Sequence, residues 1–367
     1  MLSRMLLKII YLTLLSSLFI NVLVNSSFAL TNIAKNLNLV VSDGLTSTVN
    51  TNNQICTRKK LNSIPLVFDR KSNNQSSPKR FRSSPNLQIA SFDNSPEIAG
   101  LKEFNSSGSG QLSADDFKKI YTAIVKLKPD IHIYFIDLRK EFHGFVNEDA
   151  VSRHALHNWI NYAKTPEMVE QEQALLLNGL KKKKQTTIND ITEKKDGEIA
   201  KLHKNKVEVK TVRSEEELVK SLGANSNYLR FYVDDHSAPN PEEIDRFIKF
   251  IDGLDKLDGK YWLHFHCRGG SGRTSTFMTF TDMLKNADKV SMEDIMNRQK
   301  ELGGRDLNKT KNDTTKKDAK KNPTIILEAF EKRKAVLEKF YQFAKERLNK
   351  TIPKEKSWSE WIATNKK

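Results

Sequence analysis

A buried strand that runs directly into a glycine-rich loop is the feature that most constrains how this chain can fold. Residues 261–266 (YWLHFH) have the length and apolar composition of a buried strand, and Cys267 follows them at once. The glycines after Cys267 favour a tight turn, and the apolar positions beyond the turn predict a helix. A strand, a turn and a helix in this order are typical of a parallel sheet covered by helices.

Other predicted strands and helices alternate around this segment. Strands are predicted at residues 131–136, 206–212 and 228–233. Helices are predicted at residues 149–162, 166–184 and 324–349, and after Ser113, after Ser214 and from Pro241 onward. We therefore expect an α/β fold with a mostly parallel central sheet flanked by helices, and a ligand site at the carboxyl ends of its strands.

The N-terminus has the order of regions found in a secretory signal peptide. Arg4 and Lys8 precede an apolar run over residues 9–24, and a small-x-small cleavage pattern ends at Ala29. An uncleaved anchor is the alternative, because the apolar run is near the length of a short transmembrane helix. The cleavage pattern and Asn21 favour removal near Ala29 and a secreted or periplasmic protein without stable membrane insertion.

Composition shifts divide the rest of the chain. The predicted segments are a signal peptide at 1–29, a disordered lead-in at 30–60, a small β-rich subdomain segment at 61–112, a catalytic domain at 113–350 with a lysine-rich loop at 308–322, and a C-terminal tail at 351–367. The lysine-rich loop is either a solvated loop or a binding element, and the solvated loop is the more frequent case.

The composition excludes several classes of protein. Among 367 residues, 38% are hydrophobic and 29% charged, which excludes a wholly disordered chain, a collagen and a multi-span membrane protein. The formal net charge of +16 favours an anionic partner. Because no glycine-aromatic RNA-binding signature accompanies this charge, binding of a phosphate ester explains it better than binding of nucleic acid.

Only two cysteines occur, Cys56 and Cys267, so the chain has no disulfide framework and no four-cysteine zinc site. One bond between Cys56 and Cys267 remains formally possible. The motif around Cys267 argues against it, because that motif needs a free thiol.

The segment 266–274 (HCRGGSGRT) has the residues needed to hold and attack a phosphate. Its glycines let backbone N–H groups face an anion, and the next helix adds its positive N-terminal end. Arg273 can bind two phosphate oxygens, and Cys267 in such surroundings has a lowered pKa and becomes a nucleophile. The hydroxyls of Ser271 and Thr274 can bond the sulfur or the phosphate, whereas a merely structural cysteine would need neither them nor Arg273.

A thiolate that attacks a phosphomonoester also needs an acid for the leaving oxygen. The strand predicted at 228–233 is followed by Asp234 and Asp235, and either carboxyl group can donate that proton and later take one from water. The alternative is that one of them only caps the helix at Pro241.

At this point the residues resemble a known family, the bacterial tyrosine-phosphatase-like phytases, within the Cys-x5-Arg cysteine phosphatases. The resemblance covers about residues 65–348 and rests on segments in matching order: 78–82 (PKRFR), 137–145 (DLRKEFHGF), 235–239 (DHSAP), 244–247 (IDRF), 262–267 (WLHFHC), 281–284 (TDML) and 298–304 (RQKELGG).

The resemblance implies a cysteine-phosphatase fold with a small partial barrel and stepwise hydrolysis of inositol polyphosphates through phosphocysteine, without a metal or other cofactor. Cys267 would be the nucleophile, Arg273 the phosphate clamp and, by its place in an Asp-His-x-x-Pro motif, Asp235 the general acid. The substrate-binding residues that we expect are His236, His266, Arg268, Gly269, Gly270, Ser271, Gly272 and Thr274.

The sequence departs from the family pattern at four positions. Arg268 stands where an acidic residue is expected, which raises the local positive potential and suits a polyanion. Gly269 replaces an alanine and Ser271 a valine. Ala238 stands where tryptophan is common, so the acid loop lacks an aromatic anchor.

Three other groups of residues are weaker candidates. The first, Asp137, Arg139, Glu141 and His143, either lines the pocket or forms a structural ion-pair network. His154 and His157 have i, i+3 spacing but no ligand pattern for a metal around them. We expect Trp358 and Trp361 to be a packing anchor.

Two other functions remain open. The same chemistry serves a phosphatase of phosphotyrosyl proteins or phosphoinositide lipids, and a catalytically idle anion-binding effector would keep only the binding loop. The intact set Cys267, Arg273 and Asp235 argues against the idle module.

Overall fold

The computed structural model describes residues 64–72, 76–84, 98–101, 103–195, 198–309 and 324–365, which belong to one compact unit that begins at Arg58. The predicted signal peptide, the lead-in, Cys56 and most of the lysine-rich loop lie outside the described residues, and those predictions stay untested.

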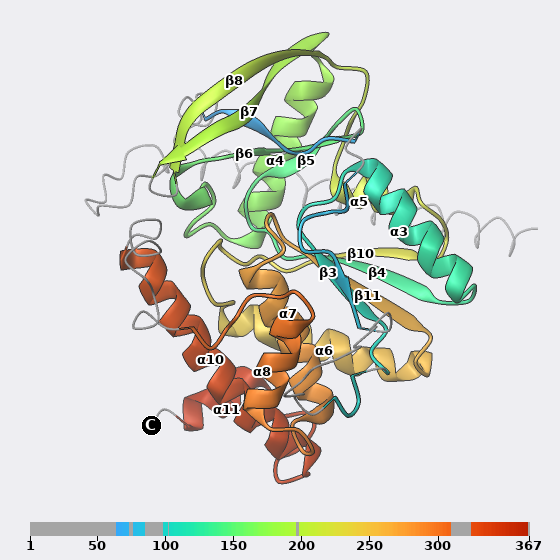
Figure 1. Ribbon diagram of the computed structural model, residues 1–367, viewed down its shortest axis with the longest axis vertical. Coiled ribbons are helices and arrows are strands. Elements are labelled where there is room, and N and C mark those ends of the chain that lie inside the picture. Colours follow the sequence, from blue (N-terminus) through green and yellow to red (C-terminus); the bar gives the residue numbers. More distant parts are fainter. Residues whose placement is uncertain are drawn as a thin grey trace, which may run out of the picture. The chain divides into compact units, whose positions relative to one another are not determined.

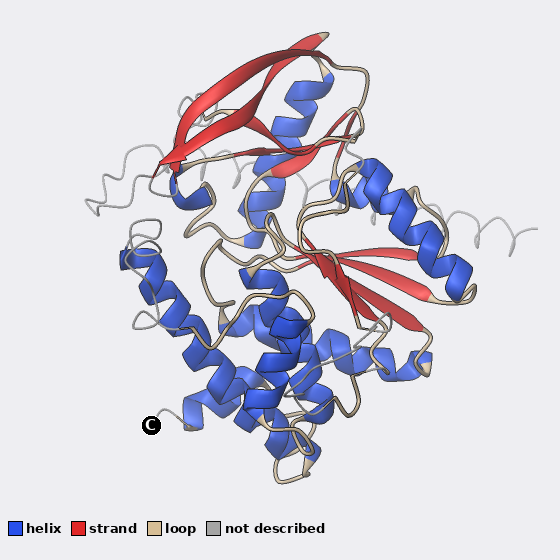
Figure 2. Cartoon of the chain, viewed as in Figure 1, coloured by secondary structure: helices blue, strands red, loops and turns tan. Residues whose placement is uncertain are grey.

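A five-stranded sheet forms the centre of the fold (Figures 1 and 2). Its order is β10 (Ser226–Arg230), β4 (His132–Asp137), β11 (Tyr261–His266), β3 (Ser106–Ser109) and β2 (Arg82–Ser83). The first four strands are parallel, and β2 is antiparallel to β3. The predicted mostly parallel central sheet is thus confirmed.

Helices cover both faces of this sheet because successive side chains of a buried strand point to opposite faces. On β11, Trp262 packs with the helices α3 (Ala114–Leu127) and α5 (Glu215–Lys220), whereas Leu263 and Phe265 pack on the other side. That second layer contains α6 (Pro241–Gly253), α7 (Gly272–Asn286), α8 (Met292–Glu301), α10 (Thr324–Leu348) and α11 (Trp358–Thr364), as Figure 1 shows.

Local capping explains where several of these helices begin. The hydroxyl of Ser113 accepts from the N–H of Asp116, and Ser214 does the same with Glu217, so both helices start with a capping box. Pro241 opens α6 behind the N-cap Asn240. The starts of these helices confirm the prediction from sequence.

A second sheet has six strands in the order β8 (Glu198–Glu208), β7 (Gln185–Lys195), β1 (Leu66–Arg70), β6 (Asp149–Arg153), β5 (His143–Val146) and β9 (Val212–Arg213). Its apolar face packs on α4 (Pro166–Lys181) through Leu177 and Leu180. The strands of the segment 61–112 join both sheets, since β1 lies in this one and β2 and β3 lie in the central one.

Two sequence predictions were wrong in this region. Residues 149–162 form β6 and a single 3-10 turn, η1 (Leu156–Asn158), because β6 pairs on both sides with β1 and β5. The strand predicted at 206–212 has the wrong bounds: residues 206–208 are the end of the longer β8, and residue 212 begins β9. β8 pairs with β7 in a hairpin that the sequence did not reveal. Most of the hairpin's outer residues are exposed, so it lacks the regular apolar alternation that identifies a strand.

The C-terminal helix α11 confirms one further prediction. Trp358 and Trp361 are buried and stack with ring centroids 5.7 Å apart, so they anchor the end of the chain in the core. Within the described residues, no helix is long and apolar enough to cross a membrane.

Candidate active site

Residues 267–273, which run from the end of β11 into the first turn of α7, are called the cysteine loop below. Two of its glycines are closely packed: a side chain at the first would meet backbone atoms, and one at the second would displace the end of an arginine side chain. Gly270 has a φ of +67°, and a Cβ there would lie 2.4 Å from the backbone nitrogen of Gly110. At Gly272 a Cβ would lie 2.5 Å from Nη1 of Arg333. The glycine pattern in the sequence therefore reflects close packing as well as turn geometry.

The segment around β2 holds the cysteine loop from outside. Arg80 donates to the carbonyl of Gly269 at 3.0 Å, and Arg82 donates to the carbonyl of Gly270 at 2.9 Å. The N–H of Gln111 donates to the carbonyl of Arg268 at 3.2 Å. Three successive loop carbonyls are thus bound by external donors, which fixes the conformation of the loop.

The thiol of Cys267 lies at the wall of a pocket and is 3% exposed. The hydroxyl of Thr274 donates to its sulfur at 3.2 Å. Burial alone would raise the pKa of this thiol, but the charge of Arg273 and the hydrogen bond from Thr274 outweigh burial and hold the pKa below its usual value. The site therefore favours a thiolate.

The guanidinium of Arg273 is held by a set of fixed acceptors. Glu141 accepts from it at 2.6 and 2.9 Å, and the carbonyl of Val233 accepts at 3.0 Å. A second carboxylate, Asp235, lies 3.0 Å from Nη2. Arg273 is 2% exposed, so its charge acts from beneath the pocket on Cys267 and Asp235 together.

Asp235 lies at the pocket, whereas its neighbour Asp234 does not line it. Burial raises the pKa of Asp234, which is 3.2 Å from Lys140. Burial also opposes ionisation of Asp235, but the nearby Arg273 prevails and lowers the pKa of that carboxyl. The pKa directions favour Asp234 as a proton carrier, and the geometry favours Asp235. A phosphate bound to Arg273 would compete for the contact that keeps Asp235 ionised, so Asp235 is the better placed of the two to carry a proton at the pocket.

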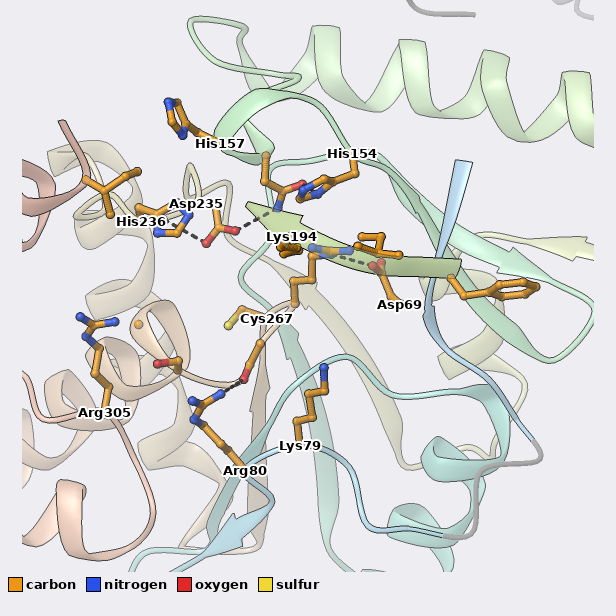
Figure 3. Close-up of a pocket in the computed structure, with 18 of the residues that line it drawn as sticks. Asp69, Lys79, Arg80, His154, His157, Lys194, Asp235, His236, Cys267 and Arg305 are labelled. Atoms are coloured by element: carbon orange, nitrogen blue, oxygen red, sulfur yellow. Dashed lines mark hydrogen bonds and ion pairs between the residues drawn. The ribbon is translucent and has the colours of Figure 1, made fainter. Parts of the chain in front are cut away.

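The pocket in front of the cysteine loop has a volume of about 630 Å³, and Figure 3 shows residues that line it. In that view Arg305 lies on one side of Cys267 and Asp69 on the other, with Lys79 and Arg80 below. The cationic side chains that line the pocket are Lys79, Arg80, Lys194, Arg268, Arg305 and Arg333. These cations come from segments on both sides of the cysteine in the sequence.

One wall of the pocket is built around the ring of Phe330 on α10. The guanidinium of Arg305 lies 3.9 Å from the ring centroid, and that of Arg333 lies 5.9 Å from it. Arg333 is buried and donates to the carbonyl of Ser237 at 2.7 Å. Burial and the like charge of Arg305 lower the pKa of Arg333 to about 9. Two cations close together in this way favour an anionic ligand.

On the opposite wall, Arg268 is paired with a carboxylate. Its Nε lies 2.7 Å from Asp69, which also lies 3.0 Å from the fully buried Arg139. The positive potential expected from Arg268 is therefore partly offset by Asp69.

The predicted site residues fall into two groups. Those that line the pocket are Cys267, Asp235, His236, Arg268, Gly269, Ser271 and Gly272. Those that support it from behind are Arg273, Gly270 and Thr274.

His266 differs from the predicted substrate contact. It is fully buried, its Nε2 lies 2.6 Å from Glu215, and its ring packs against Phe117. Strand alternation explains this difference, because His266 points to the face of the sheet that α3 and α5 cover.

The weaker candidates at the end of β4 form a buried network behind the site. His143 lies 3.1 Å from Asp137, and Arg139 lies 2.9 Å from Glu141. None of these four residues lines the pocket, so the structural ion-pair interpretation holds. Glu141 still reaches the site, because it binds Arg273 directly.

Several pocket residues were missed from the sequence. His154 and His157 had been considered only as metal ligands, and both line the pocket together with Asn158. Lys194 comes from the unexpected hairpin, and Arg333 comes from a helix beyond the lysine-rich loop. No spacing in the sequence connects these positions to Cys267, and only the tertiary structure brings them together.

Comparison with known proteins gives a family for this arrangement. Residues 136–285 match the family model of PTP-like phytases. The description of that family model names inositol hexakisphosphate. A PTP-like myo-inositol phosphatase of Mitsuokella multacida, whose structure contains myo-inositol-(1,3,4,5)-tetrakisphosphate, is 30% identical with a TM-score of 0.70, over 82% of this chain and 48% of that one. A PTP-like phytase of Bdellovibrio bacteriovorus is 27% identical with a TM-score of 0.58, over 85% of this chain and 98% of that one.

The chain also resembles proteins of Pseudomonas and Xanthomonas. The effector protein hopD2 of Pseudomonas syringae is 29% identical over 267 residues, which are 73% of this chain and 53% of that protein. The uncharacterized protein AvrBs1.1 of Xanthomonas campestris is 35% identical over 106 residues, 28% of this chain and 89% of that protein. The chain thus spans about half the length of hopD2 and of the Mitsuokella enzyme. The matched segment contains β11, the cysteine loop and the acid loop, and the solved relatives share the fold around them, so the chain belongs to the PTP-like phytase family.

Proposed function

We propose that this protein removes phosphate groups from inositol polyphosphates through a phosphocysteine intermediate on Cys267. The main support for this proposal is a buried thiol of lowered pKa that lies at a pocket lined by cations. These cations come from segments before and after Cys267 in the sequence. A thiolate supplies the nucleophile, and the surrounding cations supply affinity for a substrate with several phosphates.

The reaction has two balanced steps. The sulfur of Cys267 attacks phosphorus while the ester bond breaks, and Asp235 gives its proton to the leaving inositol oxygen. Water then attacks the phosphocysteine, Asp235 takes a proton from it, and the bond between sulfur and phosphorus breaks to release inorganic phosphate. Arg273 and the N–H groups of the cysteine loop stabilise the charge of the transferred phosphoryl group in both steps.

The shape of the pocket supports a polyphosphate over a single phosphate ester. While one phosphate lies on the cysteine loop, Arg305 and Arg333 are placed on one wall and Lys79, Arg80 and Lys194 elsewhere around the opening. A ring with phosphates in several directions can reach more than one of these groups. His236, Arg268 and Ser271 line the same space and are proposed substrate contacts.

We also propose that the protein is exported, since residues 1–29 have the order of a secretory signal. The similarity to hopD2, which is named an effector protein, is consistent with a role outside the producing cell.

Phosphate release tests the proposed substrate class. Purified protein is given inositol hexakisphosphate or a phosphotyrosyl peptide at acidic to neutral pH, with Cys267→Ser and Asp235→Asn as comparison variants. We expect a higher kcat/KM for the inositol substrate and no activity in Cys267→Ser. Preference for the peptide would identify a protein-tyrosine phosphatase instead, and anion binding without turnover by reduced, folded protein would identify an idle binding module.

A further inference from the structure

The side chain of Asn158 connects the proposed acid to the support of Arg273. It is 3% exposed, and its Nδ2 donates to Asp235 Oδ2 at 3.0 Å and to Glu141 Oε1 at 2.9 Å. Its Oδ1 lies 3.1 Å from Nδ1 of His154. All three contacts come from one carboxamide on η1, a segment that belongs to neither the cysteine loop nor the acid loop.

The orientation of this carboxamide is fixed by charge. Turning it over would place its oxygen against two carboxylate oxygens, whereas the observed orientation places both N–H groups there. The oxygen then needs a donor, so His154 carries its proton on Nδ1. The backbone of Asn158 is left-handed, with a φ of 62°, a conformation that Asn tolerates better than most residues.

The two oxygens of Asp235 have different partners. Oδ2 accepts from Asn158, whereas Oδ1 lies 3.0 Å from Nη2 of Arg273 and accepts from the N–H of His236 at 3.0 Å. A phosphate on the cysteine loop competes with Oδ1 of Asp235 for the guanidinium of Arg273. The contact of Oδ2 with Asn158 remains. Oδ1 then keeps the N–H of His236 but loses the guanidinium, so it is the oxygen placed to carry a proton toward the leaving group.

We propose that Asn158 is a positioning residue that anchors Oδ2 of Asp235, so that Oδ1 delivers the proton once the substrate phosphate has engaged Arg273. The inference rests on the proposed phosphatase function and adds a residue that acts only through the acid. The indole N–H of Trp159 supports the same loop by donating to the carbonyl of Asp235 at 2.7 Å.

The test compares two leaving groups. An inositol alkoxide needs a proton as it departs, whereas 4-nitrophenolate is a stable anion and needs little help from an acid. Asn158→Gly removes the carboxamide and tolerates the left-handed backbone. We expect kcat for inositol hexakisphosphate to fall about 10- to 100-fold, because the variant loses a part of the rate enhancement that general acid catalysis contributes. We expect kcat for 4-nitrophenyl phosphate to change less than about threefold.

Two comparison variants sharpen this test. Asn147→Gly is the matched control, because Asn147 also has a left-handed φ of 57° and binds backbone groups away from the pocket, such as the carbonyl of Glu208. It should behave like the unaltered protein on both substrates. In an Asp235→Asn background, Asn158→Gly should cost nothing further on inositol hexakisphosphate, because the acid that it positions is already gone.

Several results would overturn the inference. These are no loss on inositol hexakisphosphate, an equal loss on both substrates, or the same loss with and without Asp235. If Asn158→Gly does not fold, Asn158→Ser replaces it, and failure of both to fold would assign Asn158 a structural role instead. If Asp235→Asn shows no dependence on the leaving group, the acid lies elsewhere and Asn158 does not position it.

Failure of the proposed substrate class has a different signature. The unaltered protein would then hydrolyse 4-nitrophenyl phosphate but not inositol hexakisphosphate, and glycerol 2-phosphate would replace the latter as the alkyl ester in the same comparison. If the unaltered protein hydrolyses no phosphomonoester, both the proposed function and the role of Asn158 are contradicted.

Discussion

The ionisation of the Cys267 thiol depends on a few contacts that the structure shows directly. Burial acts against its ionisation, and Arg273 and Thr274 act for it with the larger combined effect. The hydroxyl and the backbone N–H of Thr274 are both uncharged donors to this sulfur. Replacing Thr274 by alanine removes the hydroxyl alone, so its contribution can be measured separately.

We predict that Thr274→Ala raises the pKa of the Cys267 thiol by about one unit or more, because a hydrogen bond to a charged group is worth about 1.5–3 kcal/mol. The pH dependence of iodoacetamide alkylation measures this pKa, with inorganic phosphate as a competing ligand that should protect the thiol. An unchanged midpoint in the variant would show that the hydroxyl does not stabilise the thiolate.

Arg333 is a second single residue whose contribution can be tested, because its buried guanidinium is part of a pocket wall. We predict that Arg333→Met raises KM for inositol hexakisphosphate about tenfold or more and changes KM for 4-nitrophenyl phosphate far less, since only the larger substrate reaches that wall. Arg246→Met is the control, because Arg246 pairs with Glu243 on α6 and does not line the pocket. Equal effects of the two substitutions would remove Arg333 from the substrate site.

At the scale of elements, the β2 segment serves the active site without contacting the sulfur. Arg82 is 4% exposed and donates to the carbonyl of Gly270 and to the hydroxyl of Ser275. Because these bonds support the whole cysteine loop, their loss should affect all substrates alike, in contrast to the loss of Asn158.

We predict that Arg82→Met lowers kcat on inositol hexakisphosphate and on 4-nitrophenyl phosphate by a similar factor. It should also lower the free energy of unfolding by about 2 kcal/mol, the scale of hydrogen bonds that involve a charged group. Steady-state kinetics and denaturant unfolding measure the two effects. A loss confined to inositol hexakisphosphate would mean that Arg82 acts on substrate binding and not on the loop.

The elements that the sequence predicted well have strong local signals. The strand β11 is a short run rich in aromatic and apolar residues, and α3 and α5 begin at capping boxes. The region 149–162 was predicted as a helix, but the pairing of β6 with β1 and β5 decided the structure of its first residues. Such long-range pairing leaves no local trace.

In the site, too, some residues could be predicted from local sequence motifs, and others are brought together only by the tertiary structure. Cys267, Arg273 and Asp235 follow strands of a parallel sheet, so their meeting at one edge follows from the fold class. Asn158 and Arg333 reach the site from η1 and α10 and carry no motif of their own. His266 was assigned to the substrate because it adjoins Cys267, although the alternation of β11 turns it into the core.

For the molecule as a whole, the pocket residue His154 makes the free energy of unfolding depend on pH in the acidic range. Burial and the charges of Arg268 and Lys194 lower its pKa from 6.5 to about 4. The folded protein therefore keeps His154 neutral over a pH range in which the unfolded chain protonates it, so unfolding takes up a proton.

We predict that this residue makes the free energy of unfolding fall as the pH drops from about 6.5 to about 4, by at most about 3 kcal/mol. Denaturant unfolding at several pH values measures the slope, and His154→Gln, which cannot titrate, should show a smaller loss over this range. The same slope in both proteins would mean that His154 is protonated in the fold as readily as in the unfolded chain.

In the proposed reaction each phosphate passes through Cys267, and this step can be tested by trapping the intermediate. Protein turning over inositol hexakisphosphate is quenched in acid within milliseconds, digested, and analysed by mass spectrometry for a phosphoryl group on the peptide that contains Cys267. We expect a phosphorylated Cys267 that accumulates during turnover and is absent when inorganic phosphate release has ended. Release of phosphate without modification of Cys267, or by Cys267→Ser, would contradict it.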